Sequence, residues 1–254
     1  NLLSLVTDHE TAIDASPEVD HISAMMTPRK TLVFDLDGTL ANTAPDIIAT
    51  LNAILASLGH PPLPDHHAIQ MIGNGARALL AAGLKAAGVP FDQVLLDKLF
   101  VQFLAHYEKH IADKTQLYPG VIESLDRFAE DGFIFAVCTN KMEHHSKLLL
   151  EKLGIKDRFS AICGRDSFPF FKPDPRHLTM TITEAGGNPE HAVMVGDSGT
   201  DIQTAKNAKI PVVAVNFGYS ETSVELLNPD VVIEHYDHLY EAAIMLAKKQ
   251  ILTV

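Results

Sequence analysis

Short runs of strand-forming residues recur along most of the sequence, and most of them are separated by segments with helical periodicity. These runs are 31–35, 133–140, 159–164, 192–198, 211–218 and 230–235. Strands that alternate with helices form right-handed βαβ units, in which the strands are parallel and helices cover both sheet faces. The alternation therefore predicts an α/β fold with a doubly wound, Rossmann-like core built on a parallel sheet.

A long helical block interrupts this alternation between the first and second runs. Residues 45–112 carry apolar side chains at three-to-four spacing and are predicted to be helical, with Pro45 in a first-turn position. Such a block is too long for a simple crossover between two parallel strands. We therefore expect an inserted helical domain at 44–115 and a core domain made of 30–43 and 116–254.

The beginning of the sequence differs from the rest in its charge. Residues 1–24 hold five acidic side chains and no Lys or Arg. No periodic apolar pattern begins before position 30, and unanchored terminal segments are commonly poorly ordered. We expect residues 1–29 to form a flexible N-terminal extension.

Acidic side chains outnumber basic ones by 32 to 20, which gives a net charge of -12. Such a surface repels nucleic acid and anionic membranes, so neither is expected as a partner. No apolar run approaches the roughly 18–20 residues of a membrane-spanning helix, and no secretory signal pattern is recognised. Cys138 and Cys163 lie in apolar runs and are interpreted as reduced core residues, so a cytoplasmic location is expected.

Polar residues gather at the carboxyl ends of three of the predicted strands. They are Asp35 and Asp37 after the first, Thr139 and Asn140 in the second, and Asp197 followed by Asp201 after the fourth. Lys172 precedes the fourth strand in a loop that two prolines constrain. In open parallel sheets, ligands bind beyond the carboxyl ends of the strands, so these groups are expected to converge there.

Several carboxylates in one place repel one another, and a hard divalent cation relieves that repulsion. A set of oxygen ligands without His or Cys favours Mg²⁺ over zinc. A carboxylate-bound metal with a lysine and a hydroxyl nearby suits phosphoryl transfer, where catalysis is mainly positioning and neutralisation of charge. Mg²⁺, Lys172 and backbone N–H groups near Gly38 would then form a positive pocket on an acidic protein.

The two aspartates after the first strand suit two different tasks. In an extended segment, residues i and i+2 point the same way, so both carboxylates can face one ligand. Asp35 can attack phosphorus and become an aspartyl phosphate. Asp37 can protonate the leaving oxygen and then activate the hydrolytic water. Gly38 permits a tight turn that aims backbone N–H groups at phosphate oxygens.

Four motifs in the sequence match, in order, those of the haloacid dehalogenase-like superfamily. They are DLDGT at 35–39, CTN at 138–140, KPDP at 172–175 and GDSGTD at 196–201. The helical block that follows the first motif is similar to the C1-type cap of that superfamily. Within the superfamily, the chain resembles the phosphoglycolate phosphatases, as the segments MIGNGARALL and GYS…PDVVI indicate.

This resemblance implies a fold, a reaction and a set of residue roles. The implied fold has the sheet order 5-4-1-2-3. The implied enzyme is a Mg²⁺-dependent phosphoric monoester hydrolase, a monomer or homodimer, that converts 2-phosphoglycolate to glycolate and phosphate through an aspartyl phosphate. The resemblance implies that Asp35 is the nucleophile and Asp37 the general acid and base. It implies that Thr139 and Asn140 contact the phosphoryl group and that Lys172 stabilises its charge. It also implies that Asp35, the carbonyl of Asp37 and Asp197 bind Mg²⁺, with support from Asp201.

Some features leave alternatives open. The segment at 73–78, GNGARA, fits a dinucleotide-binding pattern, but its position inside the helical block favours a turn and a helix start. Arg77 is a candidate for binding a substrate carboxylate, which arginine contacts with two hydrogen bonds. Asn74 is a second candidate from the helical block to face the active site.

Asn42 stands where relatives commonly have an acidic residue. Alternative functions are a phosphomutase, a phosphatase for another small metabolite, or a non-catalytic phosphate-binding protein.

Overall fold

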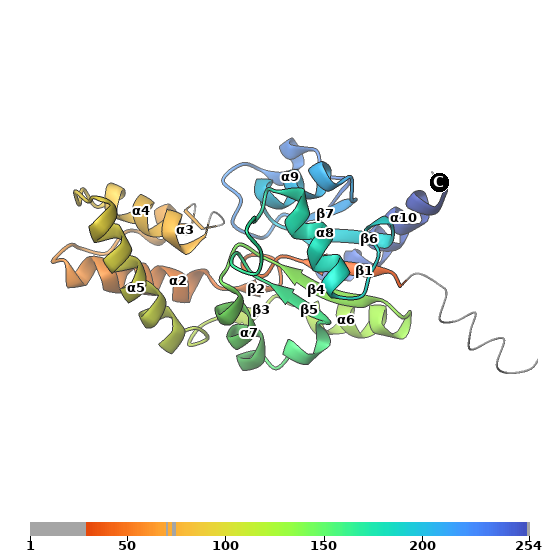
Figure 1. Ribbon diagram of the computed structural model, residues 1–254, viewed down its shortest axis with the longest axis horizontal. Helices are drawn as coiled ribbons and strands as arrows, with labels where there is room; N and C mark the ends of the chain where they lie inside the picture. Colours follow the sequence, from red (N-terminus) through yellow and green to blue (C-terminus); the bar gives the residue numbers. More distant parts are fainter. Residues whose placement is uncertain (1–28, 70, 73–74, 253–254) are drawn as a thin grey trace, which may run out of the picture.

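The helices and strands form two parts, a sheet domain and a helical lobe, that lie end to end along the molecule (Figure 1). The computed structural model describes residues 29–69, 71–72 and 75–252. The extension predicted over 1–29 lies outside the described residues except for Arg29, and Asn74 also lies outside them.

The sheet domain is built on one parallel sheet, which has six strands within the described part of the chain. The strands are β1 (Thr31–Phe34), β4 (Ile134–Cys138), β5 (Ala161–Cys163), β6 (Ala192–Gly196), β7 (Val212–Val215) and β8 (Val231–Ile233). Their spatial order is β5-β4-β1-β6-β7-β8, and every neighbouring pair is parallel. The predicted α/β fold is confirmed. The implied five-strand order is also confirmed, and β8 extends it beyond β7.

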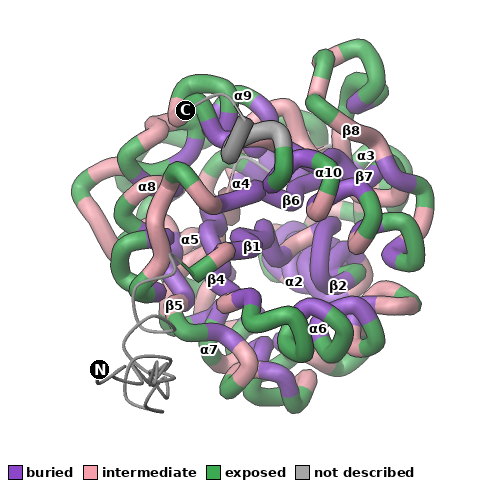
Figure 2. The backbone as a smooth tube through the Cα atoms, turned by 90° about the vertical axis from the view of Figure 1, so that its right-hand side faces the viewer, coloured by how far each residue is buried: buried purple, intermediate pink, exposed green. Residues whose placement is uncertain are grey.

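Alternate residues of each strand point to opposite faces of the sheet, and helices cover both faces. Leu32 and Phe34 belong to the apolar cluster that includes the helices at 121–130, 143–152 and 239–252, whereas Val33 belongs to the cluster with the helices at 175–184 and 199–208. Figure 2 shows the buried strands β1, β4 and β6 enclosed by these more exposed helices. Burial on both sides explains why the strands are nearly continuous apolar runs in the sequence. The helices are α6 (Val121–Glu130), α7 (Glu143–Lys152), α8 (Pro175–Glu184), α9 (Gly199–Ala208) and α10 (Leu239–Leu252).

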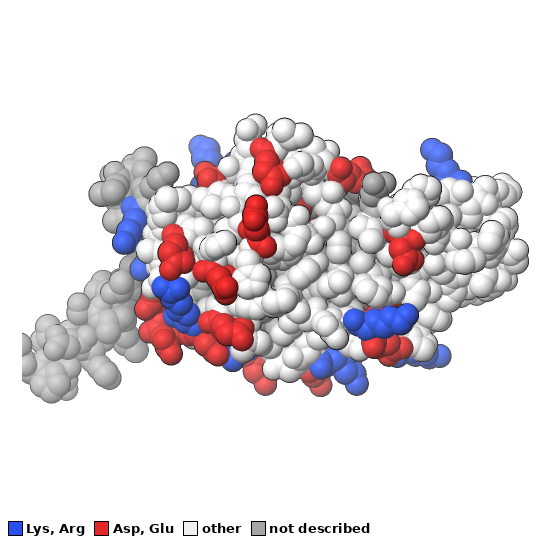
Figure 3. Space-filling model, turned by 180° about the vertical axis from the view of Figure 1, so that it is seen from behind, with Lys and Arg blue, Asp and Glu red and all other residues white. Residues whose placement is uncertain are grey.

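Short 3-10 helices complete the connections of the sheet domain. They are η1 (Lys156–Arg158), η2 (Pro189–His191), η3 (Val224–Leu227) and η4 (Tyr236–His238). No helix in the described ranges is both long and apolar enough to cross a membrane. On the face seen in Figure 3, basic side chains stand singly or beside acidic ones and form no continuous basic patch among the residues drawn in colour.

The helical lobe occupies the interval between β1 and β4. Its helices are α2 (Ala44–Ser57), α3 (Asp65–Ile69), α4 (Ala76–Ala86) and α5 (Gln93–Lys109). Within the described residues, the prediction that 45–112 is entirely helical is wrong at 58–64, 71–72, 75, 87–92 and 110–112, although Gly59 is a stop signal for the first helix. Three prolines, Pro61, Pro62 and Pro64, explain the first break, because proline lacks the N–H that a helix interior requires.

Two chain segments connect the lobe to the sheet domain, and they run side by side. Strand β2 (Ala41–Asn42) pairs antiparallel with β3 (Gln116–Leu117), where the outgoing and returning chains meet. Asn42 also accepts a hydrogen bond from the Tyr219 hydroxyl at 2.8 Å. The same hydroxyl accepts a hydrogen bond from the backbone N–H of Ala44 at 3.0 Å. Asn42 therefore helps to hold the first connection against the sheet domain.

A buried carboxylate at the start of the lobe fastens the second connection. Asp46 is 2% exposed. It accepts hydrogen bonds from the backbone N–H of Lys114 at 3.0 Å and from both the backbone N–H and the hydroxyl of Thr115 at 2.8 Å. The first turn of α2 is thereby tied to the chain that returns from the lobe, since buried donors need acceptors.

Replacing Asp46 should destabilise the protein more than replacing an exposed aspartate that caps a helix. Asp46→Ala leaves buried donors without an acceptor and should lower the free energy of unfolding by about 2–4 kcal/mol. Asp92→Ala is the matched control, because Asp92 accepts one exposed N-cap hydrogen bond from Leu95 and should cost about 1 kcal/mol. Urea unfolding measures both values, and equal losses would contradict the assigned role of Asp46.

Candidate active site

Three buried carboxylates meet at the carboxyl edge of the sheet. Asp35 follows β1, Asp197 follows β6, and Asp201 lies in the first turn of α9. Each offers one oxygen atom, and these oxygens all lie within 4.8 Å of one another. The parallel sheet thus brings together residues that lie far apart in the sequence, as the strand-end pattern predicts.

Lys172 provides a positive charge inside this cluster. Its side chain is 1% exposed, and its Nζ atom lies 3.1 Å from Asp35 Oδ2 and 2.5 Å from Asp201 Oδ1. Burial acts to lower the pKa of Lys172, but the carboxylates of Asp201 and Asp35 outweigh burial and raise that pKa. Lys172 is therefore a permanent cation that contacts two of the three carboxylates.

The cluster nevertheless carries more negative than positive charge. Burial raises the pKa of Asp35 to about 6, against the opposing effect of Lys172. Burial, followed by the charges of Asp201 and Asp35, raises the pKa of Asp197 well above its usual value. Asp197 accepts hydrogen bonds from the Tyr219 N–H at 2.7 Å and the Thr39 hydroxyl at 2.9 Å, but no Lys or Arg of the described chain forms an ion pair with it.

This donor set fits a divalent cation. Lys172 pairs with only two of the three carboxylates, and burial raises the pKa values of Asp35 and Asp197, so further positive charge would stabilise their ionised forms. Oxygen ligands without nitrogen or sulfur favour Mg²⁺. Members of this group of residues are therefore suited to hold the metal that the sequence predicts.

Asp201 accepts hydrogen bonds at both carboxylate oxygens, as Asp197 does, but unlike Asp197 it also forms an ion pair with Lys172. Its Oδ2 atom accepts hydrogen bonds from the Ser198 N–H at 3.0 Å and from the Ser198 hydroxyl at 2.6 Å, which completes a capping box at the start of α9. Its Oδ1 atom accepts from Lys172. Both oxygens thus have protein partners, an arrangement that suits orientation of Lys172 and a supporting position beside the metal ligands.

Gly38 permits the close approach of β1's carboxyl end to Asp197. Its φ angle is +81°, in the left-handed region that favours glycine. A Cβ atom at this position would overlap Asp197 Oδ2 and would lie 2.9 Å from Tyr219 Cδ2. The glycine is therefore required both by its backbone conformation and by the space that Asp197 occupies.

Substitution of Gly38 should damage the site beyond the cost of its backbone angle. Gly59 has a similar φ of +78°, but a Cβ atom there would have no heavy atom of the described residues within 4 Å, so Gly59→Ala isolates the conformational cost of about 1–2 kcal/mol. Gly38→Ala should lose more unfolding free energy than Gly59→Ala and should also lose the phosphatase activity that the sequence predicts, because it displaces Asp197. Urea unfolding and phosphate release measure the two effects, and matching results for both variants would contradict this explanation.

Asp37 lies outside the three-carboxylate cluster and pairs with a different lysine. Lys141 Nζ lies 2.9 Å from Asp37 Oδ1 and 3.2 Å from Oδ2, and it donates to the Tyr107 hydroxyl of α5 at 2.7 Å. Burial acts to lower the pKa of Lys141, but Asp37 and then Tyr107 outweigh burial and raise it. This chain of contacts joins Asp37 in the sheet domain to the helical lobe.

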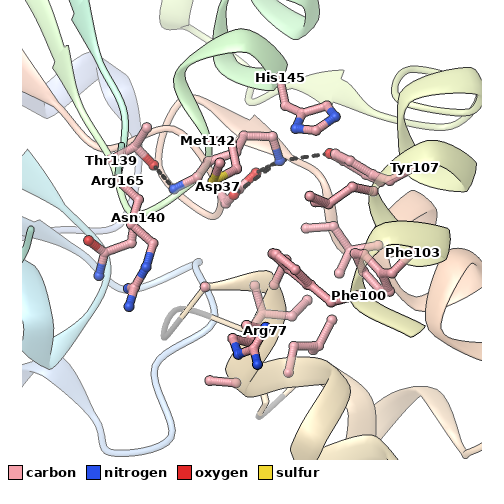
Figure 4. Close-up of a pocket in the computed structure, with 18 of the residues that line it drawn as sticks. Asp37, Arg77, Phe100, Phe103, Tyr107, Thr139, Asn140, Met142, His145 and Arg165 are labelled. Carbon is pink, nitrogen blue, oxygen red and sulfur yellow. Dashed lines mark hydrogen bonds and ion pairs between the residues drawn. The ribbon is translucent and has the colours of Figure 1, made fainter. Parts of the chain in front are cut away.

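Between the sheet domain and the lobe lies a cavity of about 450 Å³. Figure 4 shows Asp37, Thr139 and Asn140 on one side of it and Phe100, Phe103 and Arg77 on another. The sheet side is largely polar, with Asp35, Asp37, Thr139, Asn140, Lys141 and Arg165. The lobe side is largely apolar, with Ile47, Leu79, Leu96, Phe100, Phe103 and Leu104. A small polar ligand anchored at Asp35 would thus be shielded from water by the lobe.

Arg77 lines this cavity but already has a partner. Its guanidinium forms an ion pair with Asp97 on α5 and lies 5.5 Å from the centre of the Phe100 ring. Most of its interactions are thus within the lobe. Its predicted contact with a substrate carboxylate stays a prediction.

Among the residues that line the cavity and were not predicted from the sequence, three have polar groups on which the site's arrangement of charge depends: Lys141, Tyr107 and Arg165. Lys141 directly follows the CTN motif, so its position in the sequence was a usable signal. Arg165 follows β5, and the rule about carboxyl ends of strands would have identified it if applied to that strand. Tyr107 resembles any other apolar-face residue of a helix, and only the tertiary structure brings it to Lys141.

Comparison with known proteins is consistent with this geometry. Residues 32–215 match the haloacid dehalogenase-like hydrolase family. A phosphoglycolate phosphatase of Mesorhizobium japonicum is 47% identical, over 83% of this chain and 93% of that protein. An N-acetylmuramic acid 6-phosphate phosphatase of Pseudomonas aeruginosa is 32% identical, over 81% of this chain and 91% of that protein. A crystal structure of a predicted phosphoglycolate phosphatase from Haemophilus somnus has a TM-score of 0.79 at 31% identity, covering 85% of this chain and 99% of that one.

The chain belongs to the haloacid dehalogenase-like hydrolases. Within that family it groups with the phosphoglycolate phosphatases, to which it is similar along most of its length. The prediction that this protein is an enzyme, a phosphatase acting on a small phosphorylated substrate, is confirmed.

Proposed function

We propose that this protein is a Mg²⁺-dependent phosphatase that converts 2-phosphoglycolate to glycolate and phosphate through an aspartyl phosphate. The observation that carries the proposal is the position of Asp35, which lines the cavity and also belongs to the carboxylate cluster beside Lys172. A nucleophile at this point faces both the metal ligands and the space for a substrate. The similarity to phosphoglycolate phosphatases supports the choice of substrate.

Two steps describe the reaction at these side chains. In the first, an Asp35 carboxylate oxygen attacks phosphorus and the bond from phosphorus to the glycolate oxygen breaks, while Asp37 gives a proton to that oxygen. In the second, Asp37 removes a proton from water as the water oxygen attacks the phosphoaspartate, which releases phosphate and restores Asp35. Asp37 thus returns to its starting protonation state after each turnover.

The surrounding residues place positive charge and donors where the phosphoryl group would lie. Lys172 lies 3.1 Å from Asp35 and stabilises negative charge on the transferring group. Thr139 and Asn140, which line the same cavity, are proposed to contact the phosphoryl oxygens. Asp35, the Asp37 carbonyl and Asp197 would hold Mg²⁺, with Asp201 in support. When bound, Mg²⁺ supplies positive charge that offsets the charge of the phosphoryl oxygens.

The helical lobe is proposed to act as a cap, formed by residues 44–115 inserted between 30–43 and 116–254. Support comes from the cavity, whose apolar side belongs to the lobe, and from the paired strands β2 and β3 that carry both connections. A cap that covers the cavity would exclude bulk water from the phosphoaspartate until hydrolysis.

A second candidate substrate has specific support. One relative, 32% identical to this chain, is an N-acetylmuramic acid 6-phosphate phosphatase, whose substrate is a larger phosphorylated molecule. We therefore include this sugar phosphate among the test substrates. A clear preference for it over 2-phosphoglycolate would change the proposed substrate but would leave the proposed chemistry intact.

Phosphate release from a panel of monoesters should depend on both Mg²⁺ and Asp35. We expect the wild-type protein with Mg²⁺ to hydrolyse 2-phosphoglycolate faster than N-acetylmuramic acid 6-phosphate, and EDTA to abolish this activity. Asp35→Asn removes the nucleophile and should reduce kcat by about 10³-fold or more. The exposed Asp157→Asn variant is the control and should match wild type. Absence of Mg²⁺-dependent release, or full activity in Asp35→Asn, would overturn the proposal.

Lys141 should act by positioning Asp37. Lys141→Met removes the cation that contacts both Asp37 oxygens and should reduce kcat by about 100-fold, the lower range for loss of a well-placed general acid and base. Lys147→Met is a suitable control, since Lys147 pairs with Glu143 on the exposed face of α7. The pH profile of kcat should change only in the Lys141 variant. An unchanged pH profile together with wild-type kcat would show that Lys141 does not position Asp37.

A further inference from the structure

Arg165 stands in a loop whose backbone is fixed on both sides. The loop follows β5, and the Arg165 N–H donates to the Lys141 carbonyl at 2.9 Å. The Gly164 N–H donates to the Ser167 hydroxyl at 2.8 Å. The Gly164 carbonyl lies 3.1 Å from His177 Nε2 of α8. The base of the Arg165 side chain is thus held in place next to the CTN segment that lines the cavity.

The side chain of Arg165 is supported by an aromatic ring and reaches the cavity. Its guanidinium carbon lies 3.5 Å from the centre of the Phe171 ring, a stacking arrangement that orients the planar group. Figure 4 shows Arg165 beside Asn140 among the residues that line the cavity. A Cβ atom on Gly75 in the lobe would lie 3.6 Å from an Arg165 guanidinium nitrogen and 3.4 Å from the Asn140 carbonyl oxygen. Arg165 therefore lies where the lobe meets the sheet domain.

Charge pairing distinguishes Arg165 from the other cations of this region. Lys172 pairs with Asp35 and Asp201, Lys141 pairs with Asp37, and Arg77 pairs with Asp97. Arg165 forms no ion pair with a carboxylate in the part of the chain that the structure describes. Consistent with this, burial lowers the pKa of Arg165, and no carboxylate of the described residues offsets that effect.

A partly desolvated guanidinium without a carboxylate partner is a costly arrangement unless a ligand completes it. Arginine recognises a carboxylate through two parallel hydrogen bonds, and a stacked guanidinium loses little freedom on forming them. We propose that Arg165 is the specificity-determining residue that binds the carboxylate of the phosphorylated acid while the phosphoryl group lies at Asp35. This inference rests on the proposed function and names the residue that selects its substrate class.

The proposal assigns carboxylate recognition to Arg165 and not to Arg77. The Arg77 charge is already neutralised by Asp97, so a substrate carboxylate would have to compete with an internal partner. Arg165 has no such competitor among the described residues. Selectivity for an acid over a neutral phosphomonoester of the same size should therefore depend on Arg165.

The test compares 2-phosphoglycolate with ethyl phosphate, which is of similar size but lacks the carboxylate. Arg165→Met should reduce kcat/KM for 2-phosphoglycolate by about 100-fold, since a lost charged partner in a buried site costs a large factor. Its kcat/KM for ethyl phosphate should stay within about twofold of wild type. Arg165→Lys keeps the positive charge but cannot form the bidentate hydrogen bonds of a guanidinium. Its kcat/KM should fall by about 10-fold for 2-phosphoglycolate and should not fall for ethyl phosphate.

The matched control is Arg176→Met. Arg176 also stacks on a phenylalanine, Phe170, at 4.4 Å, but it pairs with Asp174 and is not among the residues that line the cavity. This variant should leave both substrates unaffected. Circular dichroism and thermal unfolding establish that each variant is folded.

Binding provides a readout that does not require turnover. Calorimetry with Mg²⁺ present would compare 3-phosphonopropionate with propylphosphonate, two phosphonates that differ only in the terminal carboxylate. Wild type should bind 3-phosphonopropionate more tightly, and Arg165→Met should abolish that difference.

The outcomes separate this inference from the proposed function. If wild type releases no phosphate from 2-phosphoglycolate in Mg²⁺, both fail. If wild type prefers 2-phosphoglycolate to ethyl phosphate and Arg165→Met keeps that preference, the assignment of Arg165 alone is overturned. Selective loss in Arg77→Met with none in Arg165→Met would also overturn it and transfer the role to Arg77.

Discussion

The ion pairs of Lys172 with Asp35 and Asp201 are the interaction on which this molecule's site depends. Three buried carboxylates lie within 4.8 Å of one another, an arrangement that their mutual repulsion and loss of hydration both oppose. Lys172, buried beside them, offsets part of that cost, and the remaining excess of negative charge is what suits the cluster to a divalent cation. The same excess of negative charge that destabilises the folded protein therefore suits the cluster to a divalent cation.

This electrostatic arrangement extends from the sheet edge to the helical lobe. Asp37 is paired with Lys141, and Lys141 in turn donates to Tyr107 on α5. Asp46, at the base of the lobe, accepts the hydrogen bonds that hold the returning chain at Thr115. The lobe is thus joined to the sheet domain by specific polar contacts as well as by the paired strands β2 and β3. The contact through Lys141 and Tyr107 therefore links the lobe to residues that line the cavity.

Much of the fold could be predicted because its signals are local and periodic. Apolar runs with turn signals identified the strands, and the spacing between them indicated parallel pairing, which the sheet confirms. The helical block was recognised and Gly59 indicated the end of its first helix, but the full break at 58–64, which contains three prolines, was not predicted. The rule about carboxyl ends of strands predicted that Asp35, Asp197 and Lys172 lie close together, and the structure confirms this. Arg165 was missed because it belongs to no recognised motif, although it follows a predicted strand.

The sequence by itself determined the fold class, the sheet edge at which polar groups converge, and the donor set that suits Mg²⁺, because strand periodicity and the carboxyl-end rule need no knowledge of distant contacts. Only the tertiary structure decided which partner each charge has. Lys141 pairs with Asp37, Arg77 pairs with Asp97, and Arg165 lines the cavity with no ion-pair partner among the described residues. Pairing depends on distances of a few ångströms between residues far apart in the chain. The first pair forms inside the sheet domain and the second inside the lobe, so each distance is set by how the elements of that part pack together.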